Sequence, residues 1–312
     1  MLETILFLVF LISSMLLVIK SADYAIHYST KVARGFLLPQ YVIGFLIVAV
    51  IAILPETLIS VSSALEGMPS FGLGTLFGSN VADLTLVFAL VTLISGRDLK
   101  VTSRIISNRF FYACVMASPI IFGLNGHYSR VEGVILIVIG LLFYLFVLKK
   151  SGATAEAVRE KFSLRDVALL GTSMATLLLG AHLTVKFSVS FAESLSVNPI
   201  IIGMFIVGLG TTLPELFFSL RAAKHNHDSL ALGDILGTVM ADATIVVGTI
   251  AVISPFTFNP KIVYVTGMSM VLSLLLLLYF MKSGRALTKK EALLLLLFYL
   301  LFVSAELYMN AL

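Results

Sequence analysis

This sequence is poor in the charged residues that a water-soluble protein needs: they make up only 12% of its 312 positions. A soluble domain carries about 25%, whereas 59% of this chain is hydrophobic and its mean hydropathy is +1.06. Tryptophan is absent, and the single cysteine, Cys114, excludes an intrachain disulfide. There is no G-x-x-x-x-G-K loop followed by Ser or Thr, which argues against direct drive by ATP. We therefore expect a protein of the lipid bilayer, with no nucleic-acid partner and no ATP.

Ten apolar runs are long enough to cross a membrane as helices of about 20 residues each. The predicted spans are 2–20, 38–65, 71–95, 104–124, 130–149, 165–192, 197–222, 229–254, 259–281 and 288–311. The first run has Glu3 where a signal peptide would be basic, so we interpret it as the first membrane helix. The longest polar connection, from Lys149 to Asp166, leaves no room for a large soluble domain.

Two segments of the chain are versions of one another, at a constant offset of 159 residues and without a gap. Residues 44–83 contain GFLIVAVIAILPE and GTLFGSNVAD, and residues 203–242 contain GMFIVGLGTTLPE and GDILGTVMAD. The copies fall on spans two and three and on spans seven and eight, so five helices repeat once. Because five is odd, the second copy enters the membrane from the opposite side. We predict an all-α membrane protein with ten transmembrane helices in two inverted five-helix repeats, 1–150 and 165–312, joined by a cytoplasmic linker at 151–164.

Lys and Arg residues are concentrated in alternate loops. The loops that follow odd-numbered spans hold most of them, whereas the opposite loops hold only Arg130, Lys186 and Lys261. Cytoplasmic loops of membrane proteins carry an excess of Lys and Arg. We therefore predict a multi-pass protein of the cell membrane with both termini extracellular.

Each copy of the repeat places a glutamate, Glu56 or Glu215, directly after a proline inside a membrane span. Each copy also places an aspartate, Asp83 or Asp242, in the following span. An ionised carboxylate in a bilayer costs roughly 2.5–3.5 kcal/mol even on lenient scales, so acids placed twice by one pattern predict two halves of one cation site. Proline also frees backbone carbonyl oxygens, which a membrane tolerates only where they line a cavity or bind something.

Hydroxyl groups and glycines accompany the aspartates. Ser79 and Asp83 are four residues apart, as are Thr238 and Asp242, so each helix presents a hydroxyl and a carboxylate on one stripe. Carboxylate, hydroxyl and carbonyl oxygens suit hard cations such as Ca²⁺ and Na⁺. Small residues that let helices approach closely also stand four apart on both helices: Gly74 and Gly78, and Gly233 and Gly237.

This constellation resembles the cation/Ca²⁺ exchanger superfamily, and in particular its sodium/calcium exchangers of the prokaryotic, ten-helix type. The resemblance rests on GLGTTLPE at 208–215, LPE at 54–56, GSNVAD at 78–83 and GTVMAD at 237–242. It implies a set of metal ligands: Glu56 and Glu215 at the centre, Ser79, Asp83, Thr238 and Asp242 around them, and Thr211 and Thr212 at a flanking Na⁺ site beside carbonyls near Ala49 and Gly208.

The same resemblance implies an activity. The chain is expected to be a secondary antiporter, not an enzyme, and to exchange Ca²⁺ for Na⁺ by alternating access without a cofactor. Spans one and six, which lack matched intramembrane acids, would be the sliding elements.

The first copy departs from the family pattern. The family usually reads G-T-S-x-P-E there, whereas this chain has Ile51, Ala52 and Ile53, so two hydroxyls expected to bind Na⁺ are missing. Asp83 also stands where sodium/calcium exchangers often have Asn. Crowded carboxylates favour protonation of some of them. Coupling to H⁺ or K⁺, and transport of a different divalent cation, therefore stay open.

Other interpretations of these residues also stay open. Ser79 and Thr238 could bond back to their own helices, and we interpret Asp234, which matches Thr75, as an interfacial acid near the cytoplasmic end. An intramembrane aspartyl protease would use two aspartates, but its Gly-x-Gly-Asp motif is matched only by ALGD at 231–234, which lacks the first glycine. A passive cation channel is the third class, and an inverted repeat suits alternation better.

Overall fold

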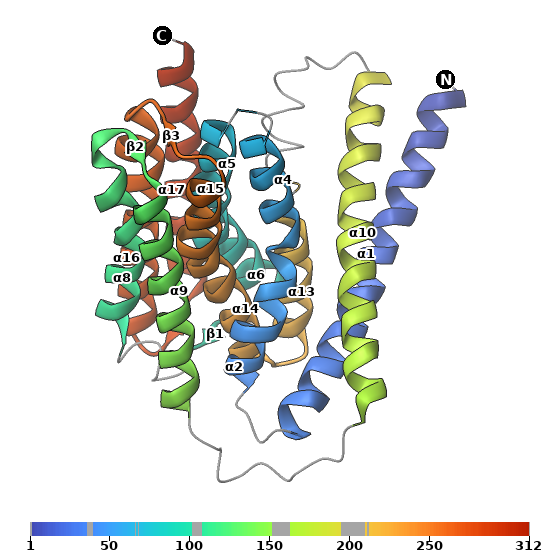
Figure 1. Cartoon of the computed structure of the whole chain (residues 1–312). Coiled ribbons are helices and arrows are strands. Elements are labelled where there is room, and N and C mark those ends of the chain that lie inside the picture. The colour runs from blue at the N-terminus through green and yellow to red at the C-terminus, as the bar shows by residue number, and fades with distance from the viewer. Residues whose placement is uncertain are drawn as a thin grey trace.

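The computed structural model describes residues 2–35, 40–65, 67, 69–101, 108–151, 163–194, 210 and 212–311. They form a bundle of helices (Figure 1). Seven of the described helices are long and apolar enough to cross a membrane, and Arg109–Asn125 is a shorter apolar helix. The predicted span 38–65 is divided into several pieces, and much of 197–222 lies outside the described residues. The all-α membrane class is confirmed, and the count of ten spans stays a prediction.

The helices follow the predicted spans closely. The first half contains α1 (Leu2–Gly35), α2 (Gln40–Ile43), the π-helix η1 (Gly44–Val48), α3 (Ala49–Ala52), α4 (Leu54–Leu65), α5 (Pro69–Ala82), the π-helix η2 (Asp83–Val87), α6 (Phe88–Ser95), α8 (Arg109–Phe122), the 3-10 helix η3 (Gly123–Asn125) and α9 (Arg130–Ser151). The second half contains α10 (Leu164–Ser194), α13 (Leu213–Lys224), α14 (Asp228–Ala241), the π-helix η5 (Asp242–Val246), α15 (Val247–Ile253), the π-helix η6 (Ile262–Gly267), α16 (Met268–Lys282) and α17 (Lys289–Ala311).

α1 is longer than the sequence predicts. The predicted span is 2–20, but α1 continues well beyond it. The additional turns carry two charged residues that are paired with other helices: Arg221 of α13 donates to Asp23 at 2.5 Å, and Lys31 donates to Asp166 of α10 at 2.8 Å. Because partners outside the helix satisfy these charges, they do not end it, and the predicted boundary was wrong.

Two short sheets mark opposite ends of the bundle. β1 (Leu99–Lys100) pairs with β4 (Ala286–Leu287), and β2 (His127–Tyr128) pairs with β3 (Phe256–Thr257). At the 159-residue offset β2 matches β4 residue for residue, yet β2 lies at the upper end of Figure 1 and β1, the partner of β4, lies at the lower end. Matched segments at opposite ends are what an inverted repeat requires. Both chain ends lie at the upper end, as an even number of spans requires.

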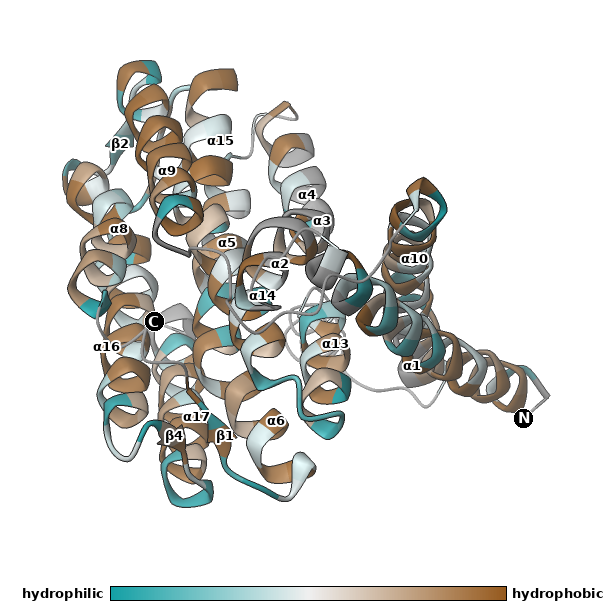
Figure 2. Ribbon diagram, turned by 90° about the horizontal axis from the view of Figure 1, so that it is seen from below, coloured by the Kyte–Doolittle hydropathy of each residue, from teal (hydrophilic) through white to brown (hydrophobic). Residues whose placement is uncertain are grey.

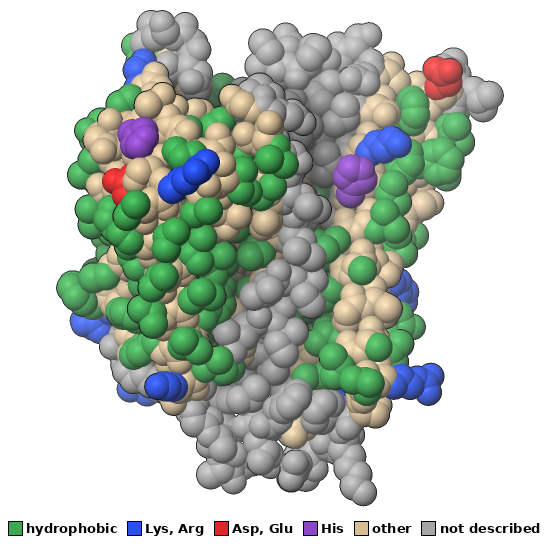
Figure 3. All heavy atoms as spheres, in the orientation of Figure 1, with side chains coloured by type: hydrophobic (Ala, Val, Ile, Leu, Met, Phe, Trp, Pro, Cys, Tyr) green, Lys and Arg blue, Asp and Glu red, His purple; other side chains and the backbone are tan. Residues whose placement is uncertain are grey.

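The bundle has a buried centre and an apolar exterior. In an apolar 18-residue stretch within Gly72–Ser95 and within Asp228–Ile253, 72% and 83% of the residues are buried, compared with 11% in such a stretch of Lys289–Tyr308. The centre of the bundle is therefore built from the third and eighth predicted spans. Hydrophobic side chains cover most of the described surface on the left of Figure 3, which fits a surface that faces lipid.

Glycines bring α14 against η1. A Cβ atom added to Gly237 would lie 2.6 Å from both the Ala49 Cβ and the Phe45 carbonyl oxygen, and one added to Gly233 would overlap the backbone of Tyr41. The predicted close approach is confirmed for this pair. At Gly74 and Gly78 no described atom lies within 4 Å of such a Cβ, and residues 201–209, which match 42–50, lie outside the described residues.

α1 and α10 lie side by side along their length at one side of the bundle (Figures 1 and 2), and the second half of α1 packs on the bundle through a buried cluster that includes Ala22, Ala52 and Phe218. They are the predicted spans one and six. Thr184 of α10 donates to Ser14 of α1 at 3.1 Å, and the ion pair Lys31–Asp166 joins their other ends. The two elements predicted to slide are thus paired with each other, and Asp23 links the pair to the central bundle through Arg221.

Candidate cation site

Both glutamates lie at the start of a short helix that follows an interruption. α3 ends at Ala52 and α4 begins at Leu54, which places Glu56 in the first turn of α4. Thr212 precedes α13 and Glu215 lies in its first turn. The predicted break at each proline is therefore present. Glu56 is 1% exposed and Glu215 is 0% exposed, so both carboxylates are inside the protein.

The aspartates occupy matched positions on the two central helices. Ser79 and Asp83 lie at the junction of α5 and η2, and Thr238 and Asp242 lie at the junction of α14 and η5. All are at least 96% buried. In both copies the π-helix begins at the aspartate itself. Because π-turns inside α-helices frequently mark functional sites, this symmetry singles out the same two residues as the sequence repeat.

A pair of matched threonines lies within these π-turns. Thr85 donates to the Val81 carbonyl at 2.5 Å, and Thr244 donates to the Met240 carbonyl at 2.6 Å. Each hydroxyl bonds the carbonyl four residues earlier and competes with the backbone N–H for it. The helix widens in the turn that begins at the aspartate, and the next helix continues from it.

Several buried oxygens in this region have no hydrogen-bond partner among the described residues. They are both carboxylate oxygens of Glu215, both of Asp242, one of Asp83 and the hydroxyl of Thr238. A buried polar atom without a partner costs about 1–3 kcal/mol, and more if it is charged. Native proteins leave few such atoms, so a concentration of them at repeat-matched positions indicates that these oxygens bind something other than protein.

The carboxylates repel one another through the protein interior. Glu56 and Asp83 each exert a Coulombic repulsion on Glu215 and on Asp242. Among the residues whose burial the structure describes, no Lys or Arg is buried. Protein cations therefore do not neutralise the acids within this part of the chain, and a cation from solution or bound protons must do so.

The acids are not gathered into a compact metal cage. In the described ranges no group of three or more His, Cys, Asp or Glu side chains is arranged to hold a metal ion. A cation at this place would need neutral oxygens among its ligands. Such oxygens are present in the hydroxyls of Thr238 and Thr212, which are 1% and 3% exposed.

The remaining predicted ligands differ in what the structure says of them. The Ser79 hydroxyl donates to the Leu76 carbonyl of its own helix at 3.1 Å, as the alternative interpretation expected, although its lone pairs are still available to a cation. Thr211 and Gly208 lie outside the described residues. Ala52 and Ile53 are 1% and 8% exposed, so the positions without hydroxyls are buried and apolar.

Asp234 is not the interfacial acid that the sequence suggested. It is 0% exposed, and the Ser219 hydroxyl donates to its Oδ2 atom at 3.1 Å. The sequence position of Asp234 did not reveal this burial, because the side chain is enclosed where α13 and α14 pack together. One signal was available: Ser219 and its match Ser60 each follow a glutamate by four residues, which places a hydroxyl one turn from each.

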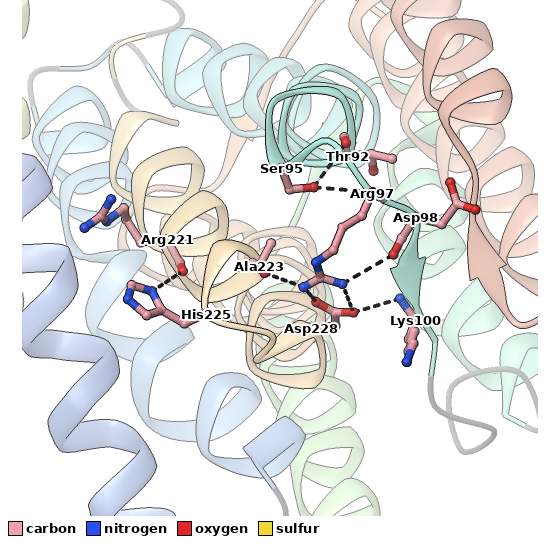
Figure 4. A network of polar contacts seen from close by, with 9 residues as sticks. All are labelled: Thr92, Ser95, Arg97, Asp98, Lys100, Arg221, Ala223, His225 and Asp228. Atoms are coloured by element: carbon pink, nitrogen blue, oxygen red, sulfur yellow. Dashed lines mark hydrogen bonds and ion pairs between the residues drawn. The ribbon is translucent and has the colours of Figure 1, made fainter.

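A polar network closes the end of the bundle near β1 (Figure 4). Arg97, in the turn after α6, donates to both carboxylate oxygens of Asp228, at 2.8 and 2.5 Å, and to the Ala223 carbonyl. The Lys100 amide donates to Asp228 at 2.9 Å. The hydrogen bond with Asp228 raises the pKa of Arg97, which keeps the guanidinium charged. The network ties the first-repeat central helix to the α13–α14 turn of the second.

Buried, repeat-matched acids in an inverted bundle of membrane helices define the class of this protein: it is a membrane transporter for cations. The chain belongs to the sodium/calcium exchanger protein family, which it matches over residues 6–149 and 166–308. Proteins of this family are transporters rather than enzymes.

Individual relatives match nearly the whole chain. The uncharacterized membrane protein MJ0091 of Methanocaldococcus jannaschii is 29% identical over 87% of this chain and 89% of its own length. The sodium/calcium exchanger MaX1 of Methanosarcina acetivorans is 24% identical over 98% of this chain and 99% of its own. A structure of the sodium-calcium exchanger NCX_Mj, soaked with Na⁺ and Sr²⁺, superposes with a TM-score of 0.84 at 25% identity and covers 96% of this chain and 99% of that one.

Proposed function

We propose that this chain is a secondary antiporter that exchanges Ca²⁺ for Na⁺ across the cell membrane by alternating access. The observation that carries the proposal is the set of buried carboxylate oxygens at Glu215 and Asp242 that have no hydrogen-bond partner in the described part of the chain. Both acids lie in the second copy of the motif and have a matched acid in the first, Glu56 and Asp83. Their oxygens are hard ligands suited to Ca²⁺ and Na⁺. NCX_Mj, whose fold this chain shares, has been studied with Na⁺, Ca²⁺ and Sr²⁺.

Charge explains why such a site would exchange ions rather than leak them. The four negative charges of Glu56, Asp83, Glu215 and Asp242 can be neutralised by one divalent cation together with protons on two of the carboxylates, or by several monovalent cations. An empty site with four negative charges is costly to move through the membrane. A loaded site is closer to neutral, so the change of access is coupled to occupancy.

The proposed ligands are Glu56 and Glu215 at the centre, with further oxygen ligands around them. These are Ser79, Asp83, Thr211, Thr212, Thr238 and Asp242. The paired helices α1 and α10 are the proposed moving elements, because they stand beside the bundle (Figure 2) and carry no matched intramembrane acid. The proposal includes two repeats, 1–150 and 165–312, and both termini outside the cell.

A second candidate is exchange of a divalent cation for H⁺, with or without K⁺. It is favoured by the buried, apolar side chains of Ala52 and Ile53, which remove two hydroxyls expected to bind Na⁺. It is also favoured by Asp83, an acid that can take a proton.

The test measures uptake of radioactive Ca²⁺ into proteoliposomes under an outward Na⁺ gradient and, separately, under an outward H⁺ gradient. We expect uptake under the Na⁺ gradient and none from Glu215→Gln. Uptake under the H⁺ gradient alone would replace Na⁺ by H⁺ as the counter-ion. Absence of Ca²⁺ uptake under both gradients would contradict the substrate, and Ca²⁺ flux that needs no counter-ion would indicate a channel.

A further inference from the structure

Asp234 is a buried acid beyond the four that the exchange proposed above uses, and that proposal gives it no role. Its side chain is 0% exposed, and its Oδ2 atom accepts a hydrogen bond from Ser219 at 3.1 Å. Its Oδ1 atom has no hydrogen-bond partner among the described residues. A buried carboxylate oxygen without a partner is costly, so this atom points to a ligand that the protein itself does not supply.

Two other oxygens lie beside this carboxylate. The Ser219 Oγ atom is 3.3 Å from the Ala231 carbonyl oxygen as well as 3.1 Å from Asp234. The Ser219 hydroxyl of α13 is therefore within hydrogen-bond distance of both the acid and a carbonyl of α14. No buried Lys or Arg is present among the residues of described burial to neutralise it. Carboxylate, hydroxyl and carbonyl oxygens together are ligands for a hard cation.

This group lies next to the central acids, toward the α13–α14 turn. Ser219 is four residues beyond Glu215, and Asp234 is four residues before Thr238. At 1.5 Å per residue, both steps correspond to about 6 Å along the helices. Asp234 also repels Glu215 and Asp83 electrostatically. The charge state of Asp234 therefore affects the central site.

The first repeat has no equivalent acid. At the 159-residue offset Thr75 matches Asp234, and Ser60 matches Ser219. The hydroxyl partner is thus present in both repeats, but the carboxylate is present only in the second. This is also the repeat that keeps threonines before its glutamate.

We propose that Asp234, Ser219 and the Ala231 carbonyl form a further binding position for a hard monovalent cation of the Na⁺ class, between the central acids and the α13–α14 turn. A monovalent ion fits because one carboxylate balances one charge, whereas Ca²⁺ takes about six to eight oxygens and commonly several carboxylates. The inference extends the proposed function, since the ion it binds is one of those exchanged. It gives the second repeat an Na⁺ position that offsets the hydroxyls absent at Ala52 and Ile53.

The test counts radioactive Na⁺ bound at saturation to the purified, full-length protein in detergent. Asp234→Asn removes the charge and keeps an oxygen that can accept from Ser219. We expect this variant to bind one Na⁺ fewer per protein than the unaltered chain. Equal Na⁺ stoichiometry together with equal affinity would overturn the proposal.

Two further variants keep the test decisive. Ser219→Ala removes the flanking hydroxyl and should weaken the binding of one Na⁺ about fivefold, the equivalent of about 1 kcal/mol. Ser60→Ala removes the matched hydroxyl of the first repeat and should leave the Na⁺ count unchanged; a drop as large as that of Asp234→Asn would contradict an effect specific to the second repeat. If Asp234→Asn does not elute as a single species, Asp234→Thr, the residue of the matched position, replaces it.

The count is independent of transport. It needs no gradient and no Ca²⁺, so absence of Ca²⁺ uptake in proteoliposomes would contradict the proposed exchange without altering the Na⁺ stoichiometry. Conversely, unchanged Na⁺ binding in Asp234→Asn would remove this position and leave the exchange intact.

Discussion

In the second repeat, Thr212 directly precedes α13, the helix that carries Glu215. In the first repeat, Ile53 directly precedes α4, the helix that carries Glu56. Both side chains are buried. Each repeat keeps the glutamate in the first turn and the π-helix that begins at the aspartate. The comparison teaches that the backbone breaks and the four acids of the proposed site are divided between both halves, whereas the hydroxyls proposed as neutral ligands are concentrated in the second. Asp234 adds a second difference, in an acid, because Thr75 occupies its place in the first repeat.

The largest expected effect tests whether the two halves are equivalent at their centre. Glu56→Gln and Glu215→Gln should each lower Ca²⁺ flux in proteoliposomes by about 100-fold or more, because a lost charge-assisted contact costs about 3 kcal/mol. Gln is nearly isosteric, so elution from a sizing column should be unchanged. Normal flux in one variant would remove that glutamate from the site and break the equivalence.

The acids of the candidate site could be predicted from the sequence, but the backbone conformation and the packing around them could not. Glu56 and Glu215 are found by the repeated LPE, and their burial follows from the cost of charge in a bilayer. The π-turns at the aspartates, and the burial of Asp234 where α13 packs against α14, emerge only in the folded chain. A periodic pattern along one chain does not contain those contacts between segments.

The second prediction concerns how tightly α14 packs against η1. Gly237→Ala should destabilise the protein by about 1–3 kcal/mol, as overpacking of a core does, because its Cβ would lie 2.6 Å from Ala49 and Phe45. Gly171→Ala is the matched control, since Gly171 is exposed on α10 and a Cβ there meets no described atom within 4 Å. The midpoint of thermal unfolding in detergent is the measurement. A Gly237→Ala protein as stable as the control would contradict the close approach.

A third prediction sharpens the comparison between the repeats by adding hydroxyl groups to the first repeat, which has fewer of them. Ala52→Thr with Ile53→Ser restores the two missing hydroxyls and should lower the Na⁺ concentration for half-maximal Ca²⁺ exchange about fivefold, or about 1 kcal/mol. Thr212→Val removes a hydroxyl from the second repeat and should raise the Na⁺ concentration for half-maximal Ca²⁺ exchange. An unchanged Na⁺ response in both variants would mean that hydroxyls at these positions do not bind Na⁺.

The fold was predictable where the apolar pattern is long and uninterrupted. α9, α16 and α17 end within a few residues of their predicted spans. The sequence failed for α1, whose charged second half is held by ion pairs with α10 and α13. A hydropathy pattern predicts that the span ends before Asp23 and Lys31, because both are charged. It does not contain their ion-pair partners, which lie on helices far away in the sequence.

The smallest expected effect distinguishes two ion pairs, Asp23–Arg221 and Asp228–Arg97, which differ in exposure. Asp23 and Arg221 are each 28% exposed at the side chain, so Asp23→Asn should change the free energy of unfolding by about 0–1 kcal/mol, as exposed pairs do. Asp228 is 8% exposed and holds Arg97 and the Lys100 amide, so Asp228→Asn should cost more, about 1–3 kcal/mol.

Their effects on transport should run in the opposite order. Asp23 joins the α1–α10 pair to the bundle, so its loss should alter the rate of Ca²⁺ exchange more than stability. Asp228 holds two parts of the bundle that are not proposed to move past one another, so its loss should act through stability. Comparing exchange rates at a temperature where both variants are folded makes the distinction. An Asp23→Asn protein with an unaltered rate would mean that this link does not hinder movement of α1, and would leave α10 as the helix to test next.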